Sequence, residues 1–135
     1  MHEATAQDLE QIEAIMTAAF ADNPLPRQVA EHQIDSPRSH FLLSEHGLIA
    51  FTEILDEIEI DYLAVLPVAQ GKGEGRALLE AVFQRPGIYR FLLEVAADNE
   101  PALKLYQKVG FREYRRRAHY YRNGQDAIMM EKEND

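Results

Sequence analysis

A glycine-rich turn at residues 71–75 is the part of this sequence whose residue types and spacing most directly suggest chemistry. Its three glycines alternate with other residues, between an apolar segment at 58–66 and a helical pattern at 77–84. Glycine lets a ligand approach the backbone closely, and the free N–H groups at the start of a helix favour negative charge. The turn therefore predicts a binding site for a phosphate-bearing ligand.

Two phosphate-binding patterns fail at this turn. A P-loop needs Ser or Thr after its lysine to hold magnesium, whereas Lys72 is followed by Gly73. A dinucleotide fingerprint begins at Gly71, but Arg76 replaces its third glycine. Glu94 does lie 21 residues after Gly73, where that fold places its ribose-binding acid. The antiparallel strands predicted before the turn and the short chain nevertheless leave no room for a doubly wound domain.

A third pattern, Gln/Arg-x-x-Gly-x-Gly/Ala, is met at residues 70–75. A purely structural turn between a strand and a helix is the alternative for so short a motif. The pattern resembles the pyrophosphate-binding turn of the GCN5-related N-acetyltransferases, the GNAT superfamily, which bind acetyl-coenzyme A (acetyl-CoA). The resemblance covers nearly all 135 residues.

Three further motifs carry the resemblance. They are Leu63-Ala64-Val65 before Pro67, then Leu93-Glu94-Val95 with Asn99, Leu105-Tyr106 and Val109-Gly110-Phe111, and last Arg117-x-x-Tyr120-Tyr121 with Asp126-Ala127-Ile128-Met129-Met130. Together they resemble the RimI-type branch, the ribosomal-protein-alanine N-acetyltransferases, more than the GNAT enzymes that modify antibiotics or polyamines.

Hydrophobic periodicity and turn residues predict the elements that must position these motifs. Thr5 and Asp8 resemble a capping box at the start of the first helix. Helices are expected at 7–20, 26–33, 77–84 and from the caps Asp98 and Asn99 to Gly110. Strands are expected near 2–5 and at 41–44, 48–55, 58–66, 88–96, 111–121 and 126–132, with Asn123-Gly124 as the last hairpin turn.

The resulting order, βαα-βββ-α-β-α-ββ, predicts an α/β (α+β) fold. We expect one GNAT-type domain over residues 1–135, with a mixed, largely antiparallel sheet and helices on both of its faces.

Composition excludes several kinds of chemistry. The chain has no cysteine, which rules out disulfides, cysteine-ligated zinc, iron–sulfur clusters and thiol nucleophiles. Its net charge of −9 argues against nucleic acid as a partner, and suits either an amine-bearing substrate or simple solubility. With no long apolar run and no clustered His, Asp and Glu, we expect a cytoplasmic protein that binds neither membrane nor metal.

The resemblance implies a catalytic pair. Glu94 matches the family's general base, acting through a water molecule, and Tyr106 matches the general acid that protonates the CoA thiolate. For Glu94 the alternative is a surface ion pair, and for Tyr106 it is core packing beside Leu103 and Val109. An α-amino group has a pKa of about 7.7–8.0, so some of it is neutral at pH 7 and one base suffices.

The resemblance also implies how acetyl-CoA is held. The strand residues Leu63, Ala64 and Val65 would meet the pantetheine arm, with the oxyanion held by backbone N–H near Ala64 and Val65, where GNAT strands splay apart at a bulge. The remaining coenzyme-binding residues are Gln70, Gly71, Lys72, Gly73, Glu74, Gly75 and Arg76 for the pyrophosphate, and Asn99, whose alternative role is a helix cap.

Tyr120 and Tyr121 match a hairpin that pairs with the peptide substrate, and ordinary strand positions are their alternative. The hypothesis is an acetyl-CoA-dependent N-acetyltransferase, monomeric or homodimeric, that acts on the α-amino group of a protein N-terminus, with a ribosomal protein as one candidate. The alternatives are acetylation of a small amine or a lysine side chain, and a non-catalytic acyl-CoA-binding module.

The sequence departs from the family pattern at three places. Residues 23–26, Asn-Pro-Leu-Pro, replace the aromatic Pro-Trp segment that shapes the peptide slot. Glu74 occupies a position that is often apolar, where its carboxylate is expected near the bound phosphates. Residues 85–87 shorten the connection to the Glu94 strand. The first departure leaves the identity of the acetyl acceptor undetermined.

Overall fold

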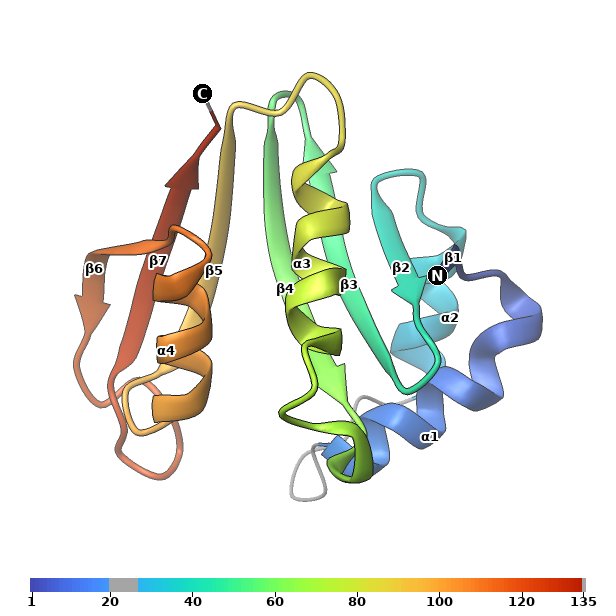
Figure 1. The fold of residues 1–135 in the computed structure, drawn as a ribbon, viewed down its shortest axis with the longest axis horizontal. Helices are drawn as coiled ribbons and strands as arrows, with labels where there is room; N and C mark the ends of the chain where they lie inside the picture. Colours follow the sequence, from blue (N-terminus) through green and yellow to red (C-terminus); the bar gives the residue numbers. More distant parts are fainter. Residues whose placement is uncertain (20–26, 135) are drawn as a thin grey trace.

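A computed structural model describes residues 1–19 and 27–134, so the segment at 23–26 lies outside the described residues. Seven strands in this part of the chain form one sheet in the order β1-β2-β3-β4-β5-β7-β6 (Figure 1). The strands are β1 (His2–Glu3), β2 (Ser39–Leu43), β3 (Gly47–Ile54), β4 (Glu57–Val65), β5 (Arg90–Ala96), β6 (Arg112–Arg117) and β7 (Ala127–Glu133). Only β4 and β5 pair in parallel, which confirms the mixed, largely antiparallel sheet.

Helices cover both faces of this sheet, as predicted. They are α1 (Leu9–Ala19), α2 (Arg27–Asp35), α3 (Glu74–Phe83) and α4 (Glu100–Lys108). In Figure 1, α3 and α4 lie in front of the sheet and α1 and α2 lie behind it. We call these two faces the α3–α4 side and the α1–α2 side.

Each face carries its own apolar cluster. On the α3–α4 side Leu78 and Leu79 pack with Phe51 and Phe91, and all four are fully buried. On the α1–α2 side Ile12 packs within a second cluster that the same sheet supplies. Alternating side chains of the central strands thus hold helices on both sides at once.

Local sequence signals explain how the first helix begins. The Thr5 N–H donates to Asp8 Oδ2 at 2.8 Å, and Thr5 Oγ1 accepts from the Gln7 N–H at 3.4 Å. This capping box starts a short 3-10 turn at residues 6–8, from which α1 continues. The predicted cap is confirmed.

The last hairpin differs from the prediction. β6 ends at Arg117, and residues 118–126 connect it to β7, so Tyr120 and Tyr121 lie in this loop rather than in a strand. His119 takes a positive φ of 52°, and its N–H donates to Asp126 Oδ1 at 3.1 Å, which ends the ladder. A tight turn still forms at the Asn-Gly pair, because the Gly124 N–H donates to the Tyr121 carbonyl at 2.9 Å.

Candidate active site

The parallel strands β4 and β5 pair over three residues each and then separate. Their last pair is Glu59 with Leu92, and beyond it the strands diverge toward the lower end of the sheet in Figure 1. The divergence leaves one edge of β4 without a neighbouring strand. Backbone groups there are free to meet a ligand.

A bulge in β4 coincides with the divergence. The register between β3 and β4 shifts between Ala50 and Phe51, which leaves Asp61 as the extra residue of β4. The bulge was expected near Ala64 and Val65, and this position is wrong. Register depends on the pairing with β3, which the β4 sequence does not reveal.

Alternation along β4 shows which backbone groups point into the opening. The Leu66 N–H donates to the His46 carbonyl of the β2–β3 turn at 2.8 Å. In an antiparallel pair every second residue faces the partner strand, so Leu63 and Val65 direct their N–H and C=O groups away from β3. Gln70 Nε2 does donate to the Val65 carbonyl from that side, at 3.0 Å.

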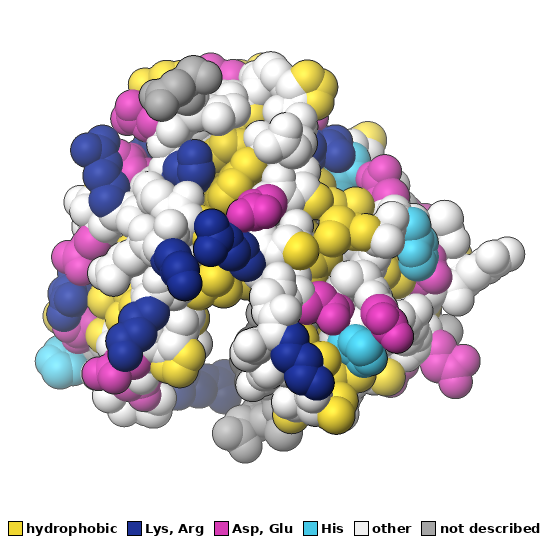
Figure 2. Space-filling model, viewed as in Figure 1, with side chains coloured by type: hydrophobic (Ala, Val, Ile, Leu, Met, Phe, Trp, Pro, Cys, Tyr) yellow, Lys and Arg dark blue, Asp and Glu magenta, His cyan; other side chains and the backbone are white. Residues whose placement is uncertain are grey.

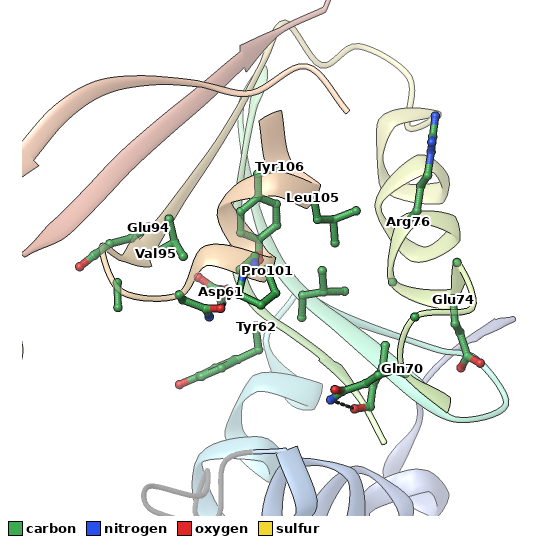
Figure 3. Close-up of a pocket in the computed structure, with 18 of the residues that line it drawn as sticks. Asp61, Tyr62, Gln70, Glu74, Arg76, Glu94, Val95, Pro101, Leu105 and Tyr106 are labelled. Atoms are coloured by element: carbon green, nitrogen blue, oxygen red, sulfur yellow. Dashed lines mark hydrogen bonds between the residues drawn. The ribbon is translucent and has the colours of Figure 1, made fainter. Parts of the chain in front are cut away.

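The opening is a cleft of about 960 Å³ lined by residues of β4, β5, α3, α4 and the 118–126 loop (Figure 3). It brings together most of the predicted site residues: Leu63, Val65, Gln70, Gly71, Gly73, Glu74, Gly75, Arg76, Glu94, Asn99, Tyr106, Tyr120 and Tyr121. Ala64 and Lys72 do not line it. Ala64 is 3% exposed on the α1–α2 side, and Lys72 borders a separate shallow depression beside His46.

Sequence reasoning missed two polar residues of this cleft, Asp61 and Tyr62. The sequence carries no local signal for them, because Ile58, Ile60, Tyr62 and Ala64 recur at every second position, as in a regular strand. Ile58 and Ile60 pack on the α3–α4 side, whereas Tyr62 and Ala64 belong to the α1–α2 side. One extra residue is needed between the two pairs, and it is Asp61.

The glycine turn forms an open cradle at the start of α3. Gly71 has a φ of 78° and Gly73 a φ of 88°, conformations that favour glycine, and no atom lies within 4 Å of a Cβ built at either position. α3 begins at Glu74, three residues earlier than predicted, with Gly73 as its N-cap. The unpaired N–H groups of this helix end fit a pyrophosphate.

Glu74 does not contribute a bare carboxylate to this cradle. It accepts hydrogen bonds from the Ser44 hydroxyl and from the His46 N–H at 2.7 Å, and His46 Nδ1 lies 3.2 Å away. Desolvation opposes its charge, but the Ser44 and His46 hydrogen bonds outweigh it and lower the pKa of the Glu74 carboxyl. The residue therefore fastens the glycine turn to the β2–β3 turn.

Basic side chains lie on the α3–α4 face (Figure 2), and among the described residues Arg76 is the one that lines the cleft. Figure 2 shows Lys and Arg side chains spread over this face, around the hollow at its lower edge. Arg76 is held by Glu80 one helical turn later, at 2.9 Å. Lys104 and Lys108 belong to α4 but do not line the cleft. The charged side chains that do line it are Arg76 and the acids Asp61, Glu74 and Glu94, so binding of an anionic ligand would depend mainly on the backbone N–H groups of the glycine turn.

Glu94 stands near the end of β5, exposed to the cleft. The Tyr121 hydroxyl donates to Glu94 Oε1 at 3.3 Å. Desolvation and then the nearby Glu94 charge raise the pKa of Tyr121 to about 12. Because Val95 packs on the α3–α4 side, its neighbour Glu94 points to the α1–α2 side. No basic side chain at residues 1–19 or 30–134 pairs with Glu94, so the alternative of a surface ion pair finds no support there.

Tyr106 lies both beside the core and at the wall of the cleft, and its role as general acid stays a prediction. It packs against Phe111 edge-to-face at 5.9 Å, next to the core, and its side chain also lines the cleft from α4 (Figure 3). Burial raises its pKa to about 12, so the phenol keeps its proton at neutral pH. A phenol that stays protonated can donate a hydrogen bond, or a proton, to a group bound in the cleft.

Asn99 and the tyrosine pair complete the lining. Asn99 Oδ1 accepts from the Ala102 N–H at 3.3 Å, so the predicted helix cap is present, and its contact with CoA stays a prediction. Tyr120 and Tyr121 stack edge-to-face at 5.4 Å, with Tyr120 51% exposed. This aromatic pair faces the opening from the loop.

Metal-binding clusters and membrane-spanning helices are both absent from the described residues. No group of three or more His, Cys, Asp or Glu side chains among them could hold a metal ion. No helix in that part of the chain is long and apolar enough to cross a membrane.

Splayed parallel strands beside a glycine-built anion cradle define a class of enzyme, an acyltransferase that takes its acyl group from a CoA thioester. Comparison with known proteins supports this class. Residues 3–134 match the family model described as an acetyltransferase (GNAT) domain. The chain belongs to the GNAT family and is an acetyl-CoA-dependent N-acetyltransferase.

Similar proteins confirm the resemblance to the RimI-type branch. The chain is 34% identical to the N-alpha-acetyltransferase RimI of Mycobacterium tuberculosis, over 96% of this chain and 87% of that protein. It is 38% identical to the [ribosomal protein bS18]-alanine N-acetyltransferase of Escherichia coli, over 67% of this chain and 68% of that protein. The crystal structure of the ribosomal-protein-S18-alanine N-acetyltransferase from Escherichia coli matches with a TM-score of 0.86 and 28% identity, over 98% and 92% of the two chains.

Proposed function

We propose that this enzyme acetylates the α-amino group of a protein N-terminus, with Glu94 as general base and Tyr106 as general acid. The observation that carries the proposal is their placement around one cleft. Tyr106 lines it from α4, on the side of the glycine cradle, whereas Glu94 points to the opposite side, next to Tyr121. A donor and an acceptor can therefore meet between them.

Different elements of the cleft would bind different parts of acetyl-CoA. The N–H groups at the start of α3 would hold the pyrophosphate, and the open edge of β4 would pair with the pantetheine arm. When bound, the thioester supplies an activated acetyl group. An N–H of Leu63 or Val65 then lies where it can stabilise negative charge on the thioester oxygen.

Proton movements complete the transfer. Glu94 removes a proton from the attacking nitrogen, directly or through one water molecule, and the C–N bond forms as the C–S bond breaks. The sulfur keeps the electron pair of the broken bond and takes the Tyr106 proton. Since the chain has no cysteine, we propose direct attack by the amine without a cysteinyl acyl-enzyme.

Two observations favour a peptide acceptor. The exposed Tyr120 and the half-buried Tyr121 border the cleft beside Glu94, as a peptide-gripping loop would. The relatives named above are N-α-acetyltransferases, one of them named for an alanine of ribosomal protein bS18. We propose a protein N-terminus, with a ribosomal protein as the first candidate to test.

The test is acetyl transfer from acetyl-CoA to a panel of peptides with free N-termini, N-blocked lysine peptides and small amines. We expect turnover on free N-termini, and much less on lysine or small amines. Preference for a lysine or a small amine would reject the N-terminal acceptor. Tight acetyl-CoA binding without turnover on any amine would reject the catalytic roles as well.

A further inference from the structure

Asp61, the bulged residue of β4, is a carboxylate that the mechanism above does not use. Thr52 Oγ1 of β3 donates to its Oδ2 at 2.8 Å. Thr52 lies next to Phe51, which packs on the α3–α4 side, so Thr52 and its partner Asp61 lie on the α1–α2 side. Glu94 points to that same side from β5, and both residues line the cleft (Figure 3).

The surroundings of Asp61 contain acids and phenols. Asp61 is open to the cleft, yet desolvation by the surrounding walls raises its pKa to about 6, against the lowering effect of the Thr52 hydrogen bond and with a small rise from Glu59. The other titratable groups that line the cleft near it are Tyr62, Glu94, Tyr106, Tyr120 and Tyr121. Among the side chains that the structure describes, at residues 1–19 and 30–134, no basic group pairs with Asp61 or Glu94.

Two carboxylates without a basic partner among the described side chains favour a ligand that carries a positive charge. A carboxylate that is exposed to the cleft, but partly desolvated by its walls, is stabilised by an incoming cation, because the attraction between the two charges is less screened there than in open water. An amine acceptor supplies that cation, since an α-amino group with a pKa of about 7.7–8.0 is mainly protonated at pH 7.

Amide formation from an ammonium group releases two protons from nitrogen. The first must leave before the lone pair can attack, and the second leaves after the C–N bond has formed. One carboxylate cannot hold both protons, and the cleft presents two carboxylates on the acceptor side.

We propose that Asp61 is a second catalytic carboxylate, which binds the acceptor as its ammonium form and takes the first proton. This inference rests on the proposed function. In the balanced sequence, the ammonium gives one proton to Asp61 and becomes the neutral amine. The amine then attacks the acetyl carbon, Glu94 takes the second proton, and the departing sulfur takes the proton of Tyr106.

Asp61→Asn tests the proposal, because asparagine keeps the shape and can still accept from Thr52. At pH 7 we expect kcat/KM for a peptide N-terminus to fall at least about tenfold, with the KM for acetyl-CoA unchanged. The defect should shrink at pH 9, where the amine is already neutral. Wild-type kcat/KM in the variant, or a loss of equal size at every pH, would overturn the role of Asp61.

Two further variants separate chemistry from folding. Thr52→Val removes the hydrogen bond that lowers the Asp61 pKa, so the acid limb of kcat/KM should move to higher pH. Glu59→Gln, on the same strand but outside the cleft, should keep the rate at pH 7 and move the limb slightly to lower pH. If both variants change only thermal stability and leave the acid limb of the kcat/KM profile at the same pH, Asp61 serves only to stabilise the β4 bulge.

The peptide panel separates this inference from the proposed function. A wild-type enzyme that fails on every N-terminus rejects the proposed acceptor, whatever Asp61 does. A wild-type enzyme that acetylates N-termini while Asp61→Asn matches it at all pH values rejects only the second carboxylate.

Discussion

Two carboxylates of the same cleft have opposite surroundings. Glu74, in the glycine turn, accepts hydrogen bonds from Ser44 and His46, which lower its pKa. Asp61, on the acceptor side, has one hydroxyl donor, and desolvation raises its pKa to about 6. The carboxylate of the glycine turn is thus partnered by the protein itself, whereas we propose that Asp61, on the acceptor side, gains its charged partner from the substrate.

This contrast also separates backbone from side-chain chemistry. The donor cradle consists of N–H groups and two glycines in positive-φ conformations. The acceptor side depends on Asp61, Glu94 and Tyr121, whose positions rest on long-range pairing. Changes on the acceptor side should therefore alter turnover, and changes on the donor side should alter coenzyme affinity or stability.

The largest effect is expected from Glu94→Gln on the acceptor side. Loss of a general base typically costs 10²–10⁴-fold, so we expect kcat to fall about 10³-fold. Acetyl-CoA affinity, measured by calorimetry, should stay the same because Glu94 points away from the glycine cradle. An unchanged kcat would remove Glu94 as the base.

Tyr106→Phe should lower kcat about 10²-fold, because the thiolate then leaves without a positioned proton donor. The phenyl ring preserves the contact with Phe111, so the melting temperature should change little. The measurement is kcat and thermal unfolding on the same preparation. A variant that loses stability but keeps kcat would assign Tyr106 to the core alone.

Gly73→Ala tests the donor side. A Cβ there meets no atom, but alanine at a φ of 88° costs about 1–2 kcal/mol. We expect the turn of the free variant to relax away from this conformation, so that restoring it on binding raises the KM for acetyl-CoA roughly tenfold. Gly87→Ala is the matched control, since Gly87 has a φ of 77° in equally open space outside the cleft. Equal KM values in the two variants would remove the turn from coenzyme binding.

Some features of the fold and the cleft could be predicted from the sequence, and others could not. The glycine turn, the caps at Thr5 and Asn99 and the mixed sheet follow local patterns, so they were predictable. The catalytic pair came from resemblance, and its roles remain predictions. The bulge at Asp61 and the loop that carries Tyr120 depend on register and on a distant contact of His119 with Asp126, which no local pattern encodes.

Glu74→Gln should destabilise the donor side. The lost charge weakens hydrogen bonds from Ser44 and His46, at a cost of about 1–2 kcal/mol in the free energy of unfolding. Because folding lowers the Glu74 pKa, its contribution is present above the ordinary carboxyl range and is lost as pH falls. Urea unfolding at pH 7 and pH 4 should therefore show the difference from wild type shrinking in acid, and a constant difference would reject the charged interaction.

Asp61→Asn should change the free energy of unfolding in the opposite direction to Glu74→Gln, and by the smallest amount. Folding raises the Asp61 pKa to about 6, so the group favours the folded state when protonated and loses that contribution as pH rises through 6. Removing the charge should stabilise the protein at pH 7, by on the order of 1 kcal/mol or less once solvent screening is allowed for. The gain should vanish below about pH 4, where the carboxyl is protonated folded and unfolded. Urea unfolding of the two proteins across this range measures it, and a loss of stability at pH 7 would mean that Asp61 serves the fold rather than the acceptor.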